Sequence, residues 1–573
     1  MAKGLLFLAA AASLTGSTFA ACTPADSKTY DYIVVGSGAG GIVVADKLSE
    51  AGKSVLLLER GPPSTGKFNG TQKPSWLSGT NLTRYDVPGL FNQIWADGVP
   101  SCPDTGVQAG CVLGGGVAVN SALYWKPHPD DWDVNFPTGW KSTDMAKYTD
   151  SVFSRIPGTY IPSKDGKLYL QQAYDTVSKG LDSAGFKYVV ANDAPTSKNM
   201  SYAHPAFYIA NGERHGPLRS YLETAYARSN FALYTDSNVR RVVRTGGHVT
   251  GVEVQCNGGN GHSGTINVTP GTGRVILAAG TFGTARLLFR SGIGPTDILN
   301  VVKGSSTDGS TMISTDQWIN LPVGSNVNDH VGTDIQISHP NVVNYDFYGA
   351  WSNPVSADKD AYLNKRSGAL TVVAPNLGPI AWTMVNGTDG KVRHIQWQMR
   401  VEGRSNTAMT ITQYLGMGTT SRGKIDIQAN MNTRVVTAPY LRDAADKQAA
   451  IDGLEAMRGY LSKISGVSWI TPTASQTSQA FINSVPATVA SRNSNHWVGS
   501  ATIGSDDGRT GGKAVVDLDT KVYGTDNLFV VDASIFPGIT TGNPSAAIFI
   551  AAEKAADRIL ALAAPAQGRR FKA

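Results

Sequence analysis

The chain has 573 residues, which is too long for one ordinary hydrophobic core and predicts two domains or one domain with large insertions. Apolar residues make up 41% of the chain and charged residues 16%, and this composition excludes long disordered tracts. The net charge of +6 is scattered without a basic stripe, so nucleic acid is not expected as a partner.

The N-terminus has the order of a secretory signal peptide. Lys3 precedes an apolar stretch over residues 4–14, and small residues then lead to a candidate cleavage point after Ala20. The apolar stretch is too short to span a membrane. We therefore expect residues 1–20 to be removed and the mature protein to be secreted, extracellular and free of membrane. Five sequons fit a glycosylated secreted protein: Asn69, Asn81, Asn199, Asn267 and Asn386.

Residues 32–59 follow the order strand, glycine-rich turn, helix, strand and acidic residue. In the G-x-G-x-x-G turn, Gly36 permits the tight turn, Gly38 lets backbone approach a pyrophosphate, and Gly41 lets helix and strand pack closely. The helix N-terminus adds a partial positive charge for the phosphate. Glu59 ends the second strand, where its carboxylate can accept both hydroxyls of an adenosine ribose. The segment predicts a dinucleotide site but does not by itself choose between FAD and NAD.

Four cysteines allow three disulfide pairings, and an oxidising compartment favours disulfides over metal sites or reactive thiols. We favour Cys102 with Cys111, which closes a short loop. The pairing of Cys22 with Cys256 is then possible but has no independent support. No spacing resembles a zinc site, so no metal is expected.

Two further glycine-containing segments follow. Residues 109–127 read AGCVLGGGVAVNSALYWKP, and three glycines serve either as a flexible turn or as backbone that lies against a flat ring or a phosphate. Residues 275–295 read as a buried strand, a turn and a helix that stops at Ser291 and Gly292. Taken alone, this second segment is an ordinary strand-to-helix unit.

The later part of the chain predicts a second sheet. Three strand-like runs, GALTVVAP, HIQWQMRV and AMTITQYLG, fit an antiparallel arrangement, and a helix-like stretch over residues 443–464 follows them. The apolar run after Pro544 is broken by charged residues, so it predicts an amphipathic closing helix rather than a membrane anchor.

Together, the dinucleotide motif, the GGG segment, GTFGTARLLFRSGIGP and the C-terminal NLFVVDASIFPGITTGNPSAAIFIAAEKAA resemble the glucose-methanol-choline (GMC) oxidoreductases. These are FAD enzymes that oxidise alcohols and sugars, and the resemblance covers nearly the whole mature chain. Within the family the chain is most similar to the flavin domain of cellobiose dehydrogenases, through LSEAGKSVLLLERGPPST, DVPGLF, GGGVAVNSALYW, NSNHW and TGNP.

The resemblance implies an α/β fold: a Rossmann-like FAD-binding domain with an inserted α+β substrate domain built on an antiparallel sheet. The FAD-binding domain would comprise residues 28–140, 215–335 and 490–570. The substrate domain would comprise residues 141–214 and 336–489. We expect a monomer, without a haem domain in this chain.

The resemblance also implies site residues. His496 would lie at the flavin face and accept the proton of the substrate hydroxyl, because imidazole has a pKa near 6.5. Asn543 would hold the same oxygen by a hydrogen bond, although TGNP also fits a simple helix-starting turn. Implied FAD contacts are Gly36, Gly38, Gly41, Glu59, Gly114, Gly115, Gly116, Asn120, Val239, Asp532 and Ala533.

Sugar contacts are expected from Asn495, Arg400, Trp95 and Asn92. The plainer alternatives are a backbone cap for Asn495, a surface cation for Arg400 and packing for Trp95. The chain departs from the family at Val117 and Ala285, and Asn92 and Trp95 stand where cellobiose dehydrogenases carry a Glu and a Phe. These departures argue more strongly against specificity for cellobiose than against oxidation of a sugar.

The expected function is that of a secreted FAD-dependent dehydrogenase. It would oxidise the anomeric C1 hydroxyl of an oligosaccharide to a lactone by hydride transfer to the flavin N5, and pass the electrons to a quinone or another small or protein acceptor. One alternative is an oxidase or aryl-alcohol-type oxidoreductase that uses O2. An alternative of another class is a flavoprotein that binds carbohydrate without redox chemistry.

Overall fold

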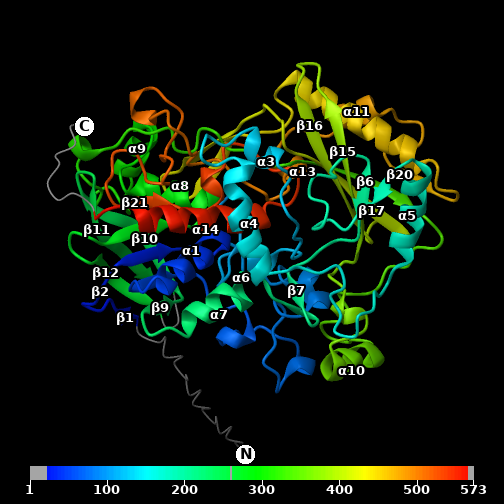
Figure 1. Ribbon diagram of the computed structural model, residues 1–573, viewed down its shortest axis with the longest axis horizontal. Helices are drawn as coiled ribbons and strands as arrows, with labels where there is room; N and C mark the ends of the chain where they lie inside the picture. The colour runs from blue at the N-terminus through cyan, green and yellow to red at the C-terminus, as the bar shows by residue number, and fades with distance from the viewer. Residues whose placement is uncertain (1–21, 258–260, 565–573) are drawn as a thin grey trace, which may run out of the picture.

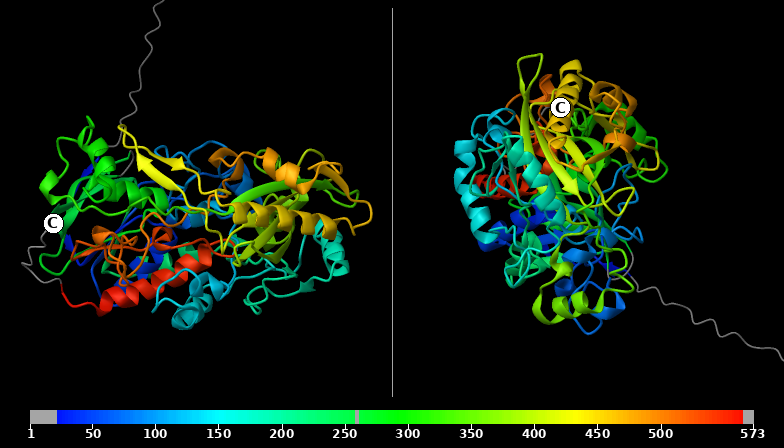
Figure 2. Two further views of the ribbon diagram at one scale, coloured as in Figure 1. Left: turned by 90° about the horizontal axis from the view of Figure 1, so that it is seen from above. Right: turned by 90° about the vertical axis from the view of Figure 1, so that its right-hand side faces the viewer.

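The computed structural model describes residues 22–257 and 261–564 (Figures 1 and 2). The predicted signal peptide, residues 1–20, lies outside the described residues. Figure 1 shows two halves, one built around the N-terminal and C-terminal segments and the other around a large sheet from the middle of the chain.

A five-stranded parallel sheet forms the centre of the first half. Its order is β21-β13-β3-β4-β9, and its strands are β3 (Tyr32–Val35), β4 (Val55–Leu58), β9 (Phe231–Tyr234), β13 (Arg274–Leu277) and β21 (Leu528–Val530). Most of these strands are short runs of apolar residues buried on both faces, as parallel sheets require. Four helices pack together in this half of the molecule: α1 (Ala39–Glu50), α4 (Ser142–Arg155), α7 (Tyr221–Tyr226) and α14 (Ser545–Ala561). Helix α14 lies between α1 and α4.

An antiparallel sheet lies beside the parallel one. It contains β10 (Ser237–Thr245), β11 (His248–Cys256) and β12 (His262–Val268), and the short strands β1 (Thr23–Pro24) and β2 (Thr29–Tyr30) pair with β12 in parallel. The helices α8 (Gly280–Arg290) and α9 (Thr296–Lys303) follow β13.

The second half is built on a seven-stranded sheet of order β20-β14-β17-β16-β15-β6-β5. Its strands are β5 (Lys187–Tyr188), β6 (Ser201–Ala203), β14 (Val331–Ser338), β15 (Leu377–Asn386), β16 (Val392–Arg400), β17 (Ala408–Leu415) and β20 (Ser468–Thr471). All neighbours pair antiparallel except β5 and β6. Helices α5 (Gln172–Ser183) and α11 (Ala444–Leu461) pack on this sheet, and α12 (Ser478–Ser484) packs on α11.

Shorter elements connect these layers: α2 (Gly116–Val119), α3 (Asp130–Asp133), α6 (Gly216–Arg219), α10 (Ser356–Lys365), α13 (Val489–Arg492), the 3-10 turn η3 (Pro88–Gln93), and the pair β7 (Ile209–Ala210) and β8 (Glu213–Arg214). The hairpin β18 (Lys424–Ile427) and β19 (Thr433–Thr437) packs on α8 and α9, away from the seven-stranded sheet, as Figure 2 shows.

The predicted fold class is confirmed, and so are the strands in HIQWQMRV and AMTITQYLG and the helix over residues 443–464. The strand predicted for GALTVVAP is wrong. Residues Ala369–Thr371 form a 3-10 turn, η5, and the rest of the run is loop. Gly368 enters the turn at a φ of +85°, and Leu370 is buried against Leu90 and Tyr362. Because this apolar run is buried between loops, it is removed from water without a neighbouring strand.

The residue limits of the two domains remain a prediction. Elements of the predicted segment 141–214 lie in both halves, because α4 packs on α14 while β5 and β6 pair in the seven-stranded sheet.

Both disulfides form: Cys102 with Cys111, as favoured, and Cys22 with Cys256. The five sequon asparagines are all exposed, and their glycosylation remains a prediction. Within residues 22–257 and 261–564, no helix combines the length and the hydropathy needed to cross a membrane.

Candidate active site

One cavity of about 490 Å³ joins the predicted dinucleotide turn to the predicted catalytic residues. Gly36, Gly38 and Glu59 line one end, and His496 and Asn543 line the other. The segments that close it come from widely separated parts of the chain. Its volume lies in the range of cofactor and ligand pockets.

In the glycine turn after β3, Gly36 and Gly41 have the geometry that their predicted roles require. Gly36 has a φ of +102°, which favours glycine, and a Cβ on Gly41 would lie 1.8 Å from the Gly36 carbonyl oxygen. Helix α1 can therefore approach the turn only because residue 41 has no side chain. Around Gly38 the nearest atom to a Cβ is the Ala278 carbonyl oxygen at 3.9 Å, so this residue faces open space in the cavity.

Glu59 is buried at the end of β4. Its carboxylate accepts hydrogen bonds from Ser37 N at 3.1 Å, Ser37 Oγ at 2.5 Å and Gly61 N at 2.8 Å. Burial raises the pKa of Glu59, and these hydrogen bonds oppose the rise. The contacts fix the carboxylate at the cavity wall, and Ser37 is a residue that the sequence interpretation missed.

The triple glycine meets the first glycine turn. Gly114 N donates to Ser37 Oγ at 3.1 Å, and a Cβ on Gly115 would lie 3.2 Å from the Gly38 Cα. Gly116 lines the cavity and has no atom within 4 Å of a Cβ position. Gly114 itself is not in the cavity wall. The two glycine segments form one cradle in which added side chains would collide or fill the cavity.

The remaining predicted cofactor residues also line this cavity: Asn120, Val239, Asp532 and Ala533. The Asn120 carbonyl accepts from Arg214 at 2.6 Å, and buried Asp532 accepts from Gly280 N at 2.9 Å and Thr284 Oγ1 at 2.6 Å. Gly41 is the one predicted cofactor residue besides Gly114 that lies behind the wall. A continuous cavity with a glycine cradle fits an elongated dinucleotide such as FAD, and each residue's contact with it remains a prediction.

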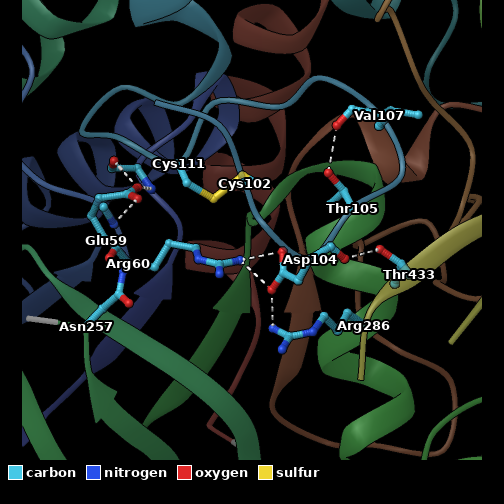
Figure 3. The surroundings of a disulfide bond; sticks show 12 residues. Glu59, Arg60, Cys102, Asp104, Thr105, Val107, Cys111, Asn257, Arg286 and Thr433 are labelled. Atoms are coloured by element: carbon cyan, nitrogen blue, oxygen red, sulfur yellow. Dashed lines mark hydrogen bonds and ion pairs between the residues drawn. A yellow bond between two sulfur atoms is a disulfide. The ribbon is translucent and has the colours of Figure 1, made fainter. Parts of the chain in front are cut away.

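Residues 102–111, here called the covering loop, line one side of the cavity. Figure 3 shows the loop with its disulfide and its ion pairs. Its ends are joined by the Cys102–Cys111 disulfide. The Asp104 carboxylate forms ion pairs with Arg60 at 2.9 Å and Arg286 at 3.0 Å, and the Asp104 carbonyl accepts from Thr433 N at 2.9 Å. The loop is thereby attached to the end of β4, to α8 and to the β18–β19 hairpin.

Asp329 organises the loop that carries His496. The buried Asp329 carboxylate accepts from His496 N at 2.8 Å, from Ser494 N at 2.9 Å and from Ser494 Oγ at 2.6 Å. Tyr440 OH donates to it as well, at 2.9 Å. Burial raises the pKa of Asp329 to about 6. These four hydrogen bonds fix the backbone on both sides of Asn495, which has a φ of +58°.

The hydrogen bonds around His496 assign its tautomer. His330 Nε2 lies 2.8 Å from the Thr540 carbonyl oxygen, which can only accept, so Nε2 carries the proton and Nδ1 is a lone pair. His496 Nδ1 lies 3.1 Å from His330 Nδ1 and must therefore donate to it. His496 Nε2 is then unprotonated and accepts from Asn543 Nδ2 at 3.0 Å.

Both histidines are neutral near pH 7. Burial lowers the pKa of His496 to about 4, and burial together with the neighbouring His496 lowers that of His330 well below its ordinary value. Asn543 is oriented in turn, because its Oδ1 accepts from Gln396 Nε2 at 2.8 Å. The result is a neutral imidazole at the cavity wall whose unprotonated Nε2 accepts from Asn543, and it can act as a general base once a substrate hydroxyl replaces that hydrogen bond.

The predicted substrate residues divide into two groups. Trp95 and Asn495 line the cavity, and Asn495 Nδ2 donates to Gln108 Oε1 at 3.3 Å. Arg400 does not line it: the guanidinium is held by Glu402 at 2.6 Å and by Thr412 Oγ1 at 2.6 Å. Asn92 lies in η3, also away from the cavity wall.

Sequence reasoning missed Asp329, His330, Gln396, Gln398 and Tyr414. Gln398 and Tyr414 come from β16 and β17 and line the cavity. A signal for the glutamines was present, since glutamine recurs at every second position in the otherwise apolar run HIQWQM, as expected where one strand face meets a polar site. No comparable pattern marks the pairing of His330 with His496.

Comparisons with known proteins agree with this fold. Two family models described as GMC oxidoreductase match residues 30–332 and 419–552. The dehydrogenase eriK of Hericium erinaceus is 28% identical over 93% of this chain and 94% of its own. Among solved structures, an FAD-dependent oxidoreductase from Chaetomium thermophilum superposes with a TM-score of 0.69 at 21% identity, over 93% of this chain and 99% of the other. A formate oxidase variant from Aspergillus oryzae reaches 0.74 at 19% identity, over 94% and 99%.

Proposed function

This chain belongs to the GMC oxidoreductase family, and from that premise we propose that it is an FAD-dependent sugar dehydrogenase similar to the flavin domain of cellobiose dehydrogenases. Its substrate would be the anomeric C1 hydroxyl of an oligosaccharide, and its product a lactone. The observation that carries this proposal is the unprotonated Nε2 of the neutral His496, in the same cavity as the glycine cradle.

Oxidation of a C–OH group removes a hydride from carbon and a proton from oxygen. FAD, when bound, supplies the hydride acceptor. A substrate hydroxyl would replace Asn543 as the donor to His496 Nε2, which then takes the hydroxyl proton. Asn543, whose Oδ1 accepts from Gln396, would donate from Nδ2 to the same substrate oxygen. His330 keeps the other His496 nitrogen protonated, so that the proton can be accepted only at Nε2, the atom that faces the cavity.

Polar groups at the substrate end support a hydroxylated substrate. Gln398 is 6% exposed and lines the cavity, and its Oε1 has no hydrogen-bond partner among the described residues. An unpaired buried acceptor is costly unless a ligand supplies a donor, and a sugar hydroxyl is such a donor. Trp95 adds an aromatic surface for a sugar ring. The proposal does not rest on Arg400 or Asn92.

We extend the proposal to the protein's setting. A secreted, glycosylated monomer fits the five exposed sequons and the two disulfides, which persist in oxidising compartments. Electrons would pass to a quinone or to another small or protein acceptor.

An aryl-alcohol-type oxidoreductase that uses O2 is the second candidate. It is favoured by the aromatic side chains in the cavity wall, namely Trp95, Phe282, Tyr414 and Trp497, which suit a planar apolar substrate as well as a sugar ring.

The deciding experiment is anaerobic bleaching of the bound flavin by cello-, xylo- and malto-oligosaccharides, glucose and aryl alcohols. We expect bleaching by oligosaccharides, whereas bleaching by aryl alcohols alone would select the second candidate. His496→Ala should keep the flavin and lose about 10²- to 10⁴-fold in the rate of its reduction. His248→Ala, on the antiparallel sheet, is the matched control. A His496→Ala variant reduced at the parental rate would refute the assignment, and no bleaching by any compound would favour a non-redox protein.

A further inference from the structure

Two histidines and an aspartate meet next to the active-site loop. His128 precedes α3, Asp130 is the first residue of α3, and His394 lies on β16. Asp130 Oδ2 lies 3.4 Å from His128 Nδ1 and 3.4 Å from His394 Nε2, and the three ligand atoms all lie within 4.8 Å of one another. His394 is fully buried, whereas 41% of the Asp130 side chain is exposed. The cluster is therefore accessible from one side.

The hydrogen bonds of His394 leave its Nε2 unprotonated. The Asp131 carboxylate accepts from Thr541 N at 2.6 Å and Thr541 Oγ1 at 2.7 Å, and its other oxygen accepts from His128 N at 2.9 Å. Because the Thr541 hydroxyl donates to Asp131, it accepts from His394 Nδ1 at 3.1 Å. His394 Nε2 is then a lone pair, and it has no hydrogen-bond partner among the residues that the structure describes.

The Nδ1 of His128 is unprotonated as well. This nitrogen accepts from Asp130 N at 3.2 Å, and the ring also hydrogen-bonds to the backbone of Thr196. Two imidazole nitrogens and a carboxylate oxygen, none carrying a proton of its own, therefore lie together, and His128 Nδ1 accepts the Asp130 N–H. A cation bound among these acceptors would offset their mutual repulsion, and it would replace the Asp130 N–H on His128 Nδ1.

The spacing suits a small divalent ion. Ligands placed tetrahedrally at about 2.0–2.2 Å from a metal lie about 3.3–3.6 Å from one another, which matches the two 3.4 Å separations. Metal-bound histidines characteristically donate from the other ring nitrogen to an oxygen. His394 does so to Thr541, which is itself held by Asp131.

We propose that His128, Asp130 and His394 bind a divalent transition-metal ion of the Zn²⁺ class, with a fourth position open to water. The sequence expectation of no metal rested on the wide spacing of the histidines, and the fold removes that spacing. The ion would join β16 of the seven-stranded sheet to α3 in the other half of the molecule. Its role would be structural. The ion would fix His394, which donates to Thr541, and Thr541 lies two residues before Asn543.

The test is metal uptake by the full-length purified protein. After treatment with a chelator, equilibration with Zn²⁺ and gel filtration, we expect about one Zn²⁺ per chain by mass spectrometry, and tetrahedral Co²⁺ absorption bands after equilibration with Co²⁺. Asp130→Asn is the least disruptive variant because its side chain reaches solvent, and it should weaken Zn²⁺ binding at least tenfold. His394→Ala should abolish binding.

His248→Asn is the matched control, because His248 also faces a carboxylate, Asp526 at 3.1 Å, but belongs to no three-ligand group among the described residues. It should keep the parental stoichiometry. For Asp130→Asn we measure both the Zn²⁺ affinity and the thermal midpoint of unfolding with and without Zn²⁺. Together these measurements distinguish a folding defect from the loss of a metal ligand. Absence of Zn²⁺ and Co²⁺ uptake by the parental protein, or parental affinity in Asp130→Asn, would overturn the proposal.

Discussion

Replacement of His330 provides the sharpest test of the tautomer assigned to His496. His330→Leu removes the Nδ1 acceptor that lies 3.1 Å from His496 Nδ1, while His330→Asn keeps an acceptor oxygen near the same position. His330 is fully buried and does not line the cavity. Neither variant removes a group that faces the substrate.

The magnitude follows from the hydrogen bond that is lost. In His330→Leu the His496 Nδ1–H has no partner, and leaving a buried donor unsatisfied costs about 1–3 kcal/mol. The imidazole can avoid this cost by moving its proton to Nε2, where it can no longer act as the base. A penalty of about 1–3 kcal/mol on the active tautomer lowers the rate about 5- to 150-fold.

The assay is the single-turnover rate of flavin reduction under anaerobic conditions, at saturating substrate. We expect the rate of flavin reduction to fall in His330→Leu and to stay within a few-fold of the parental rate in His330→Asn. The flavin content should be unchanged in both variants. A His330→Leu variant that reduces its flavin at the parental rate would refute the assigned tautomer. Equal losses in both variants would show a packing role instead.

Three further predictions concern other parts of the site. Because burial lowers the pKa of His496 to about 4 and the base must be unprotonated, the rate of flavin reduction should be constant above about pH 5 and fall tenfold per pH unit below pH 4; a midpoint near 6.5 in a stopped-flow series would contradict this. Asp104→Ala unpairs Arg60 and Arg286 and should speed flavin dissociation about tenfold, measured by fluorescence, whereas Asp426→Ala, which breaks the more exposed pair with Arg434, should not. Gln398→Leu should raise KM for oligosaccharides about tenfold and leave KM for aryl alcohols nearly unchanged; equal effects on both would remove Gln398 from sugar recognition.

The parts of the fold that the sequence predicts are those with strong local patterns. The dinucleotide unit is readable because the glycine spacing, the buried strands and Glu59 each have a local physical cause. The run GALTVVAP has the composition of a strand, yet it is buried between loops, because composition alone does not specify whether a backbone finds a sheet partner.

The candidate site, too, is predictable from the sequence only in part. The resemblance placed His496 and Asn543 together, and the structure has them in direct contact. Asp329 and His330 act on His496 across the fold, and the donor and acceptor pattern that sets the tautomer exists only once Thr540, His330 and His496 are in place. Arg400 was predicted by analogy alone, and its neighbours Glu402 and Thr412 hold it away from the cavity wall.

The covering loop has a consequence for biosynthesis. Its ends are joined covalently at Cys102 and Cys111, and Asp104, near its start, is attached to three other segments, so the loop has no free end that could swing aside. A dinucleotide beneath it would then enter most readily while the chain is still folding. If the flavin binds beneath the loop, its loading would precede the joining of these two thiols, and protein in which the disulfide forms first would remain without cofactor.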